Sequence, residues 1–110
     1  PDLAPPGIVR ITLRPNIGGD LRFAVGEFRS IKGPIRSAWR KEKGSLALDV
    51  SIPAGSVATV YVPTTRPGSV TESGRKIGKS ETIRLLGHDG DWAVYEVGSG
   101  DYRFRSEWKK

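Results

Sequence analysis

The stretch Ile52-Pro53-Ala54-Gly55-Ser56-Val57-Ala58-Thr59-Val60-Tyr61-Val62-Pro63 decides the fold that this sequence predicts. Before its Pro-Ala-Gly punctuation, large apolar residues alternate with small or polar ones over residues 46–52, and after it residues 57–62 are fairly apolar on both faces. A similar phrase, Val97-Gly98-Ser99-Gly100-Asp101-Tyr102-Arg103-Phe104, stands near the C-terminus. Strand patterns that meet at short Pro or Gly turns are typical of compact antiparallel sheets. We therefore predict that residues 57–62 form a central strand.

Strand patterns recur along the rest of the chain. Period-two alternation or a short apolar run occupies residues 8–13, 21–25, 33–41, 83–87, 92–97 and 102–105. No window of helical length carries an apolar stripe with a 3.6-residue period, so we expect very little helix. About eight short strands at roughly ten-residue spacing predict an all-β fold. The expected architecture is an antiparallel two-sheet β-sandwich, jelly-roll-like, with a small barrel as the alternative.

The segment 21–25 is expected to be a half-buried strand. Leu21, Phe23 and Val25 alternate there with more polar or smaller residues, so these three would form its apolar face. Gly26 follows directly and indicates a bulge.

Turns and one long connection are also predicted. Lys43-Gly44 and His88-Asp89-Gly90-Asp91 are typical turn sequences. Residues 64–80 are rich in Thr, Arg, Pro, Gly, Ser and Lys, and only Val70 and Ile77 offer apolar anchors. We therefore expect a long surface excursion over that range.

Length and composition bound both the architecture and the chemistry. At 110 residues the chain is long enough for one domain, which should bury somewhat over ~60% of its unfolded surface. The absence of Cys excludes disulfides, thiolate nucleophiles and Cys-ligated metal sites. The chain contains no Met and begins at Pro1, so we expect a piece of a longer polypeptide. No apolar run approaches the ~18 residues that span a bilayer, and we expect no membrane contact.

The positive charge is spread along the chain. The formal net charge is +6, and the densest basic group lies within residues 36–43, where Trp39 and Glu42 interrupt it. Net charge concerns solubility and nonspecific attraction more than fold. An ordinary solvated surface is therefore the favoured interpretation, and a basic nucleic-acid-binding domain is a weaker alternative.

The single histidine offers little chemistry. His88 would need Ser73 or Ser99 as a nucleophile, and neither serine lies in a nucleophile-elbow sequence. His88 could hold a hydrated cation together with Asp89 and Asp91, but Asp and Gly are common in turns for backbone reasons alone. We therefore expect neither a catalytic residue nor a metal ligand at this turn.

Two further motifs contain residue types that are found in catalytic or nucleotide-binding sites. Glycoside hydrolysis needs two carboxyl groups, and Glu72, in the distinctive phrase Val70-Thr71-Glu72-Ser73-Gly74, is the carboxylate of most interest. An exposed loop carboxylate is the expectation for it. Gly98-Ser99-Gly100 is too short to hold a phosphate and no helix follows it, so no nucleotide cofactor is expected.

Aromatic residues suggest ligand stacking but fit a core. Alternation places Arg103 and Arg105 on the face opposite Tyr102 and Phe104, which favours aromatics in the core and arginines in water over contacts with single-stranded nucleic acid. The three tryptophans raise the alternative of a carbohydrate-binding module. Strand registers predict core positions for Trp39 and Trp92. Trp108 lies beside the terminal lysines and should be more exposed.

Taken in order, short phrases spread over nearly the whole chain resemble one known domain, the C-terminal β-sandwich domain of bacterial α-L-rhamnosidases. Its pattern is similar to Gly-x-Ile-x-Ser-x-Trp at residues 33–39, the Ile-Pro to Val-Pro strand, the Glu-Ser-Gly loop and the ending Gly-Ser-Gly-x-Tyr-x-Phe. The remaining matching phrases are at residues 5–7, 11–15 and 18–21. Residues 4–7 lack the aromatic often found just after this Gly, and residues 64–80 are idiosyncratic.

The resemblance implies a parent enzyme that releases terminal α-L-rhamnose with inversion. Its acid and base carboxylates would lie in an α/α-barrel that precedes this domain. Residues 1–110 would be a single C-terminal accessory domain that braces the barrel and contains no catalytic, cofactor-binding or metal-binding residue. The implied partners are the barrel and a rhamnosylated glycan or glycoside, not nucleic acid. An autonomous carbohydrate-binding module stays open as the alternative.

Overall fold

A computed structural model describes residues 9–17, 22–77 and 82–109 of the chain. Within these residues it contains ten β-strands and no helix, which confirms the all-β prediction. Accordingly, the described part of the chain offers no helix that is long and apolar enough to cross a membrane. The strands are β1 (Val9–Leu13), β2 (Phe23–Ser30), β3 (Gly33–Glu42), β4 (Ser45–Ile52), β5 (Ser56–Pro63), β6 (Arg66–Glu72), β7 (Arg75–Lys76), β8 (Ile83–Asp89), β9 (Trp92–Val97) and β10 (Gly100–Glu107).

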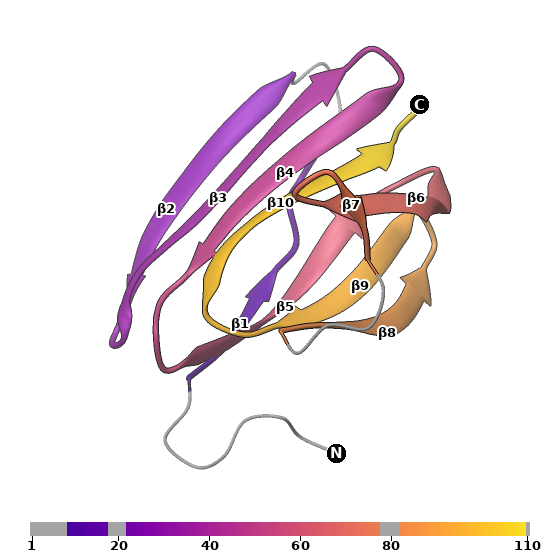
Figure 1. The fold of residues 1–110 in the computed structure, drawn as a ribbon. Coiled ribbons are helices and arrows are strands. Elements are labelled where there is room, and N and C mark those ends of the chain that lie inside the picture. Colours follow the sequence, from indigo (N-terminus) through magenta and orange to yellow (C-terminus); the bar gives the residue numbers. More distant parts are fainter. Residues whose placement is uncertain (1–8, 18–21, 78–81, 110) are drawn as a thin grey trace.

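The strands form two sheets that face each other, as the sandwich prediction requires (Figure 1). The four-stranded sheet has the order β1-β5-β9-β8, and the six-stranded sheet has the order β2-β3-β4-β10-β6-β7. Strand β5 lies between β1 and β9, so its predicted central position is confirmed. One pair, β1 with β5, is parallel, because three strands of the other sheet separate the two along the chain.

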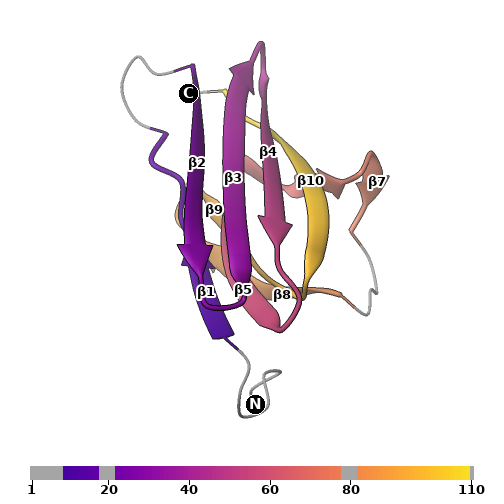
Figure 2. The ribbon, with the colours of Figure 1, turned by 90° about the vertical axis from the view of Figure 1, so that its left-hand side faces the viewer.

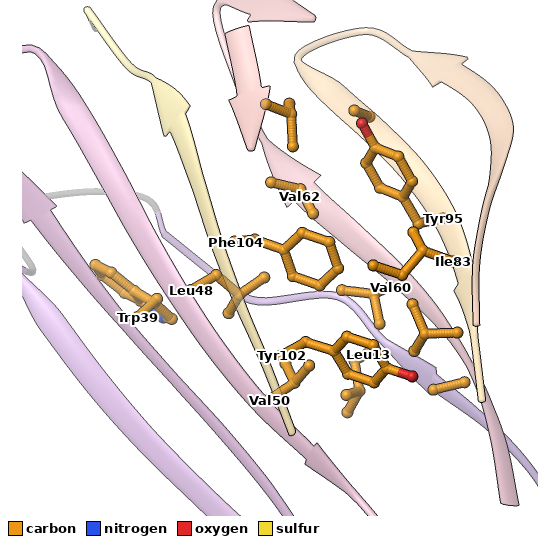
Figure 3. Close-up of a cluster of buried hydrophobic side chains, with 14 of the residues drawn as sticks. Leu13, Trp39, Leu48, Val50, Val60, Val62, Ile83, Tyr95, Tyr102 and Phe104 are labelled. Carbon is orange, nitrogen blue, oxygen red and sulfur yellow. The ribbon is translucent and has the colours of Figure 1, made fainter. Parts of the chain in front are cut away.

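The core lies between the sheets and follows the alternation of the sequence. Strand β4 buries every second residue, and β5 and β9 do the same on their inner faces. The ring of Phe104 stacks on Tyr95 from the opposite sheet at a centroid distance of 5.6 Å and on Tyr102 at 6.1 Å (Figure 3). Aromatic pairs of this kind stabilise a core beyond the apolar area that they bury.

The chain passes between the sheets at Thr64, directly after β5. The Thr64 side chain is buried, and its hydroxyl accepts the Arg66 amide at 3.0 Å and donates to the Arg66 carbonyl at 2.8 Å. The carbonyl of Glu107 in β10 lies 3.2 Å away as a second acceptor. The Ser106 hydroxyl donates to the Pro63 carbonyl in the opposite sheet. These buried polar groups all have hydrogen-bond partners. Because hydrogen bonds are directional, they fix the path of the chain at this crossing.

The segment 64–80 differs from its prediction. Residues 66–76 form the β6–β7 hairpin, and β6 pairs with β10. The expected surface excursion is therefore wrong for these residues, because cross-strand hydrogen bonds overcame a polar composition. The two anchors are confirmed, since Val70 is buried and Ile77 packs against the core. Residues 78–80 lie outside the described part of the chain.

Strand β2 faces the opposite way from its prediction. Phe23 is 66% exposed and Val25 is 57% exposed, whereas Ala24 between them packs against the core. Ala24 pairs with Trp39 of β3, whose large buried ring occupies the adjacent space (Figure 3). The register of β2 with β3 runs without a shift through Gly26, so the predicted bulge is absent. Leu21 lies outside the described residues.

Candidate functional site

The outer face of the six-stranded sheet carries a groove with a volume of about 460 Å³. Figure 2 looks onto this face, with β2 at its edge and β3, β4 and β10 beside it. One cross-strand row contains Phe23, Arg40, Ala47 and Arg105 in adjacent strands. The neighbouring row, two residues or roughly 7 Å along the strands, contains Val25, Ala38 and Asp49. The short alanine side chains form the floor, and longer side chains form the walls.

Charges line the groove in near balance. The guanidinium of Arg105 lies 2.5 Å from a carboxylate oxygen of Glu42, and that of Arg36 lies 3.5 Å from Glu27. Arg40 and Asp49 also line the groove, and no ion pair or side-chain hydrogen bond joins either to another described residue. Arginine nitrogens and carboxylate oxygens are strong hydrogen-bond donors and acceptors. The groove therefore offers both kinds of group beside an exposed aromatic ring.

A second aromatic cluster lies on the outer face of the four-stranded sheet. The rings of Tyr61 and Trp92 meet edge to face at 6.0 Å, and the guanidinium of Arg14 lies 5.2 Å and 5.1 Å from their centroids. Trp92 is half-buried on this face, so its predicted core position is wrong. Ala93 and its inward neighbours fill the core instead, because the opposite face of β9 carries the residues that pack between the sheets.

The other two tryptophans differ in their burial. Trp39 is buried in the core, as predicted. Trp108 is half-buried, which makes it more exposed than Trp39, although it packs against the core and buries its indole nitrogen. The amide of Trp108 donates to the carbonyl of Gly44 at 3.1 Å, which holds the C-terminal segment against the confirmed Lys43-Gly44 turn.

His88 lies at an exposed position on edge strand β8. Asp89 ends the same strand, and Gly90 and Asp91 form the turn to β9. Ser73 lies in the β6–β7 turn of the other sheet, and no hydrogen bond joins it or Ser99 to His88 within the described residues. Nor do three His, Asp or Glu side chains gather there into a group that could hold a metal ion.

The carboxylate of Glu72 forms hydrogen bonds within the β6–β7 turn and to the backbone of β10. Its carboxylate accepts the Ser73 hydroxyl and, at 3.2 Å, the backbone amide of Arg103 in β10. Ser73 and Gly74 both have positive φ angles, 53° and 80°, which is the conformation of a two-residue hairpin turn. The distinctive Glu-Ser-Gly phrase therefore encodes the β6–β7 turn and its attachment to β10.

The Gly98-Ser99-Gly100 phrase connects the two sheets. The Tyr102 hydroxyl donates to the carbonyl of Gly98 at 3.0 Å, with the carbonyl of Ser99 at 3.3 Å. Gly100 has a φ of 137°, which favours glycine. Burial raises the pKa of Tyr102, and the charge of nearby Glu72 adds to this effect, against a hydrogen bond with Thr82. The phenol thus acts as a buried neutral donor that fixes the crossing from β9 to β10.

Alternation in β10 is confirmed. Tyr102 and Phe104 are buried between the sheets, and Arg103 and Arg105 are exposed on the outer face. At the end of this strand Glu107 lies 3.0 Å from Lys109 and 3.7 Å from Arg66. The hydrogen bond from Lys109, with the charges of both cations, lowers the pKa of the Glu107 carboxyl.

Sequence reasoning missed the groove on the six-stranded sheet. Its residues lie on the consecutive strands β2, β3 and β4 and on the distant strand β10, and each follows an ordinary alternating pattern. The available signal was Phe23 with Val25, two large apolar side chains on one face of β2. Alternation alone does not say which face of a strand turns inward.

Comparisons with known proteins agree on one family. A family model described as bacterial alpha-L-rhamnosidase C-terminal domain matches residues 4–76. An alpha-L-rhamnosidase from Streptomyces avermitilis is 33% identical over 98 residues, which are 89% of this chain and 9% of that protein. The chain thus spans less than a tenth of the length of this relative.

Solved structures show the same relationship. The crystal structure of Streptomyces avermitilis alpha-L-rhamnosidase complexed with L-rhamnose superposes with a TM-score of 0.77 at 29% identity, over 90% of this chain and 9% of that chain. The alpha-L-rhamnosidase from Dictyoglumus thermophilum gives a TM-score of 0.72 at 27% identity, over 90% of this chain and 11% of that chain. The resemblance in the sequence is therefore confirmed, and the chain belongs to the family of bacterial alpha-L-rhamnosidase C-terminal domains.

Proposed function

We propose that residues 1–110 form a single non-catalytic accessory domain of an α-L-rhamnosidase, which braces the catalytic α/α-barrel that precedes it. The observation that carries this proposal is the match to a small part of much longer rhamnosidases, 9% and 11% of their lengths, over nearly all of this chain. The parent would hydrolyse terminal α-L-rhamnosides with inversion, using carboxylates that lie in the barrel.

The carboxylates of the groove support a non-catalytic role. Glu42 and Asp49 both line it, but Asp49 pairs with Ala38, four residues from Glu42 along β3. Four residues of strand separate the backbone positions of the two residues by about 13 Å along the strands, which is wider than the about 6.5–9.5 Å between the carboxyl groups of inverting glycosidases. The ion pair with Arg105 further constrains the carboxylate of Glu42. This spacing suits a binding surface better than hydrolysis.

One end of the sandwich is suited to contact a preceding domain. The β2–β3 hairpin tip, the β4–β5 turn and the start of β1 lie at this end (Figure 1). The amide of Val9 donates to the carbonyl of Gly55 at 3.1 Å. Ile31, at the hairpin tip, is 91% exposed. An apolar side chain so exposed at this end would gain stability from burial against the neighbouring domain.

The test compares hydrolysis of a chromogenic α-L-rhamnoside by three proteins: the parent, the parent without residues 1–110, and this chain alone. We expect activity only with the catalytic domain present, and truncation should lower the activity or the melting temperature of the parent. Turnover by this chain alone would show that it is catalytic. A truncated parent with unchanged activity and melting temperature would exclude the bracing role, and an inactive parent would refute the rhamnosidase assignment.

A point substitution tests the contact surface separately. Ile31→Lys in the parent should lower its free energy of unfolding by about 1.5–3 kcal/mol, the value of a buried aliphatic side chain, and leave the isolated chain unchanged. Leu86→Lys on β8 is the matched control, because Leu86 is also exposed, at 47%, but lies on a different edge. If Ile31→Lys leaves the parent as stable as Leu86→Lys does, the hairpin tip is not part of the contact.

A further inference from the structure

Strand β2 turns two large apolar side chains outward near its start. Phe23 and Val25 point to the outer face at 66% and 57% exposure, and Ala24 and Gly26 occupy the inward positions. A sandwich strand normally buries its largest apolar residues. Apolar side chains that are kept together on the surface commonly mark a binding site. The residues beside them on the sheet indicate what such a site would bind.

From this arrangement we infer that the groove on the outer face of the six-stranded sheet binds a neutral glycan chain. This inference does not depend on the catalytic activity of the parent. Ala38 and Ala47 keep the floor of the groove low, and Phe23 stands at its β2 side. The C–H face of a sugar ring fits the electron-rich face of an aromatic ring, and the low floor leaves room for it to lie against Phe23.

The polar groups of the groove suit hydroxyl groups. Arg40 lies in the row of Phe23, and Asp49 lies in the row of Val25. A guanidinium donates two parallel hydrogen bonds and a carboxylate accepts two, so each can hold a pair of neighbouring hydroxyls. Among the described residues neither group has an ion-pair or side-chain hydrogen-bond partner, and in the inferred complex each would bind hydroxyls of the ligand.

Charge balance distinguishes a neutral glycan from a polyanion. Although the chain has a net charge of +6, two of the arginines in the groove are already paired, Arg36 with Glu27 and Arg105 with Glu42. The remaining two charged groups, Arg40 and Asp49, have opposite signs. Binding of nucleic acid or a uronic-acid chain requires several unpaired cations. A neutral polyhydroxyl ligand fits this balance instead.

The first test uses the 110-residue chain on an array of immobilised neutral and uronic-acid oligosaccharides that includes rhamnose-terminated chains. The best ligand is then titrated into isotope-labelled chain, and amide shifts are followed by NMR. We expect a neutral ligand to bind, to shift amides of β2, β3 and β4, and to bind with little dependence on salt. Binding of no neutral chain, or binding of uronic-acid chains alone with a steep salt dependence, would overturn the inference.

Variants locate the site. Phe23→Ala should weaken binding by about tenfold or more, as loss of an aromatic anchor does, and Ala47→Leu should do the same by raising the floor. Leu85→Ala is the matched control, because Leu85 is 51% exposed on β8 of the other sheet; it should change the affinity by less than about twofold. The amide spectrum of each variant checks that it remains folded. Binding that survives Phe23→Ala would place the ligand elsewhere.

The competing occupant of this face is the parent protein itself. A cysteine introduced as Phe23→Cys into the parent, which is then labelled with a thiol reagent under native conditions, tests whether the groove is open there. We expect labelling at the rate seen for the isolated chain. Protection in the folded parent would show that another part of the enzyme covers the groove, and it would overturn glycan binding at this site.

Discussion

Replacing Thr64 by Val tests how the chain crosses between the sheets. Thr64 is 1% exposed, and Val has nearly the same shape, so the substitution opens no cavity. It removes the acceptor for the Arg66 amide at 3.0 Å and the donor to the Arg66 or Glu107 carbonyl at 2.8 or 3.2 Å. Each such hydrogen bond contributes about 1 kcal/mol, and an amide left unpaired adds a desolvation penalty. The expected loss in free energy of unfolding is therefore about 2 kcal/mol.

Urea unfolding followed by tryptophan fluorescence measures this loss, because Trp39 is buried in the core. For a domain of this size, about 2 kcal/mol corresponds to a fall in melting temperature of roughly 10 °C. Thr59→Val is the matched control, since Thr59 is half-buried on the outer face of β5 and its side chain forms no hydrogen bond with another described residue. A loss below about 0.5 kcal/mol for Thr64→Val, or an equal loss for both variants, would refute the role of this hydroxyl.

Two further predictions concern pH and backbone conformation. Burial raises the pKa of Tyr95 above its ordinary value. As pH rises above about 10, the unfolded state therefore releases this proton while the folded state retains it, and the free energy of unfolding falls. Tyr95→Phe keeps the stack on Phe104 and should lose less stability than the unsubstituted 110-residue chain between pH 7 and pH 11 in urea titrations. Gly44 has a φ of 75° with open space around it, so Gly44→Ala should cost about 1 kcal/mol. Gly68→Ala, where space is also open and φ is not positive, should change the melting temperature little.

The sequence predicted the strands better than their faces. Alternation over 46–52 and the apolar run over 57–62 located β4 and β5 and predicted the central position of β5, because both strands bury one complete set of alternating residues. The facing of β2 and β9 was wrong for Phe23 and Trp92, since period two is the same for either orientation. The buried ring of Trp39 lies opposite Ala24 on the inner side of β2, so the small residue of this stretch faces the core there and Phe23 and Val25 face outward.

The candidate site could not be predicted from the sequence, for a related reason. A hydrophobic pattern identifies residues that avoid water, but the groove depends on which polar side chains the register places beside Phe23. Arg105 enters its row through β10, which the chain reaches from β4 only after crossing to the other sheet and back twice. Such a pairing depends on long-range topology, and no local pattern near residue 23 specifies it.

The outer aromatic residues of the two sheets differ in their contacts with cations, and this difference favours one of two surfaces to which a sugar could bind. On the four-stranded sheet, the guanidinium of Arg14 already lies about 5 Å from the rings of Tyr61 and Trp92. A sugar would have to displace a cation that the rings attract. On the six-stranded sheet, Phe23 is exposed and no ring or cation contact of its side chain occurs within the described residues. Glycan binding at the groove should therefore leave the fluorescence of Trp92 unchanged, because that ring lies on the opposite outer face of the sandwich.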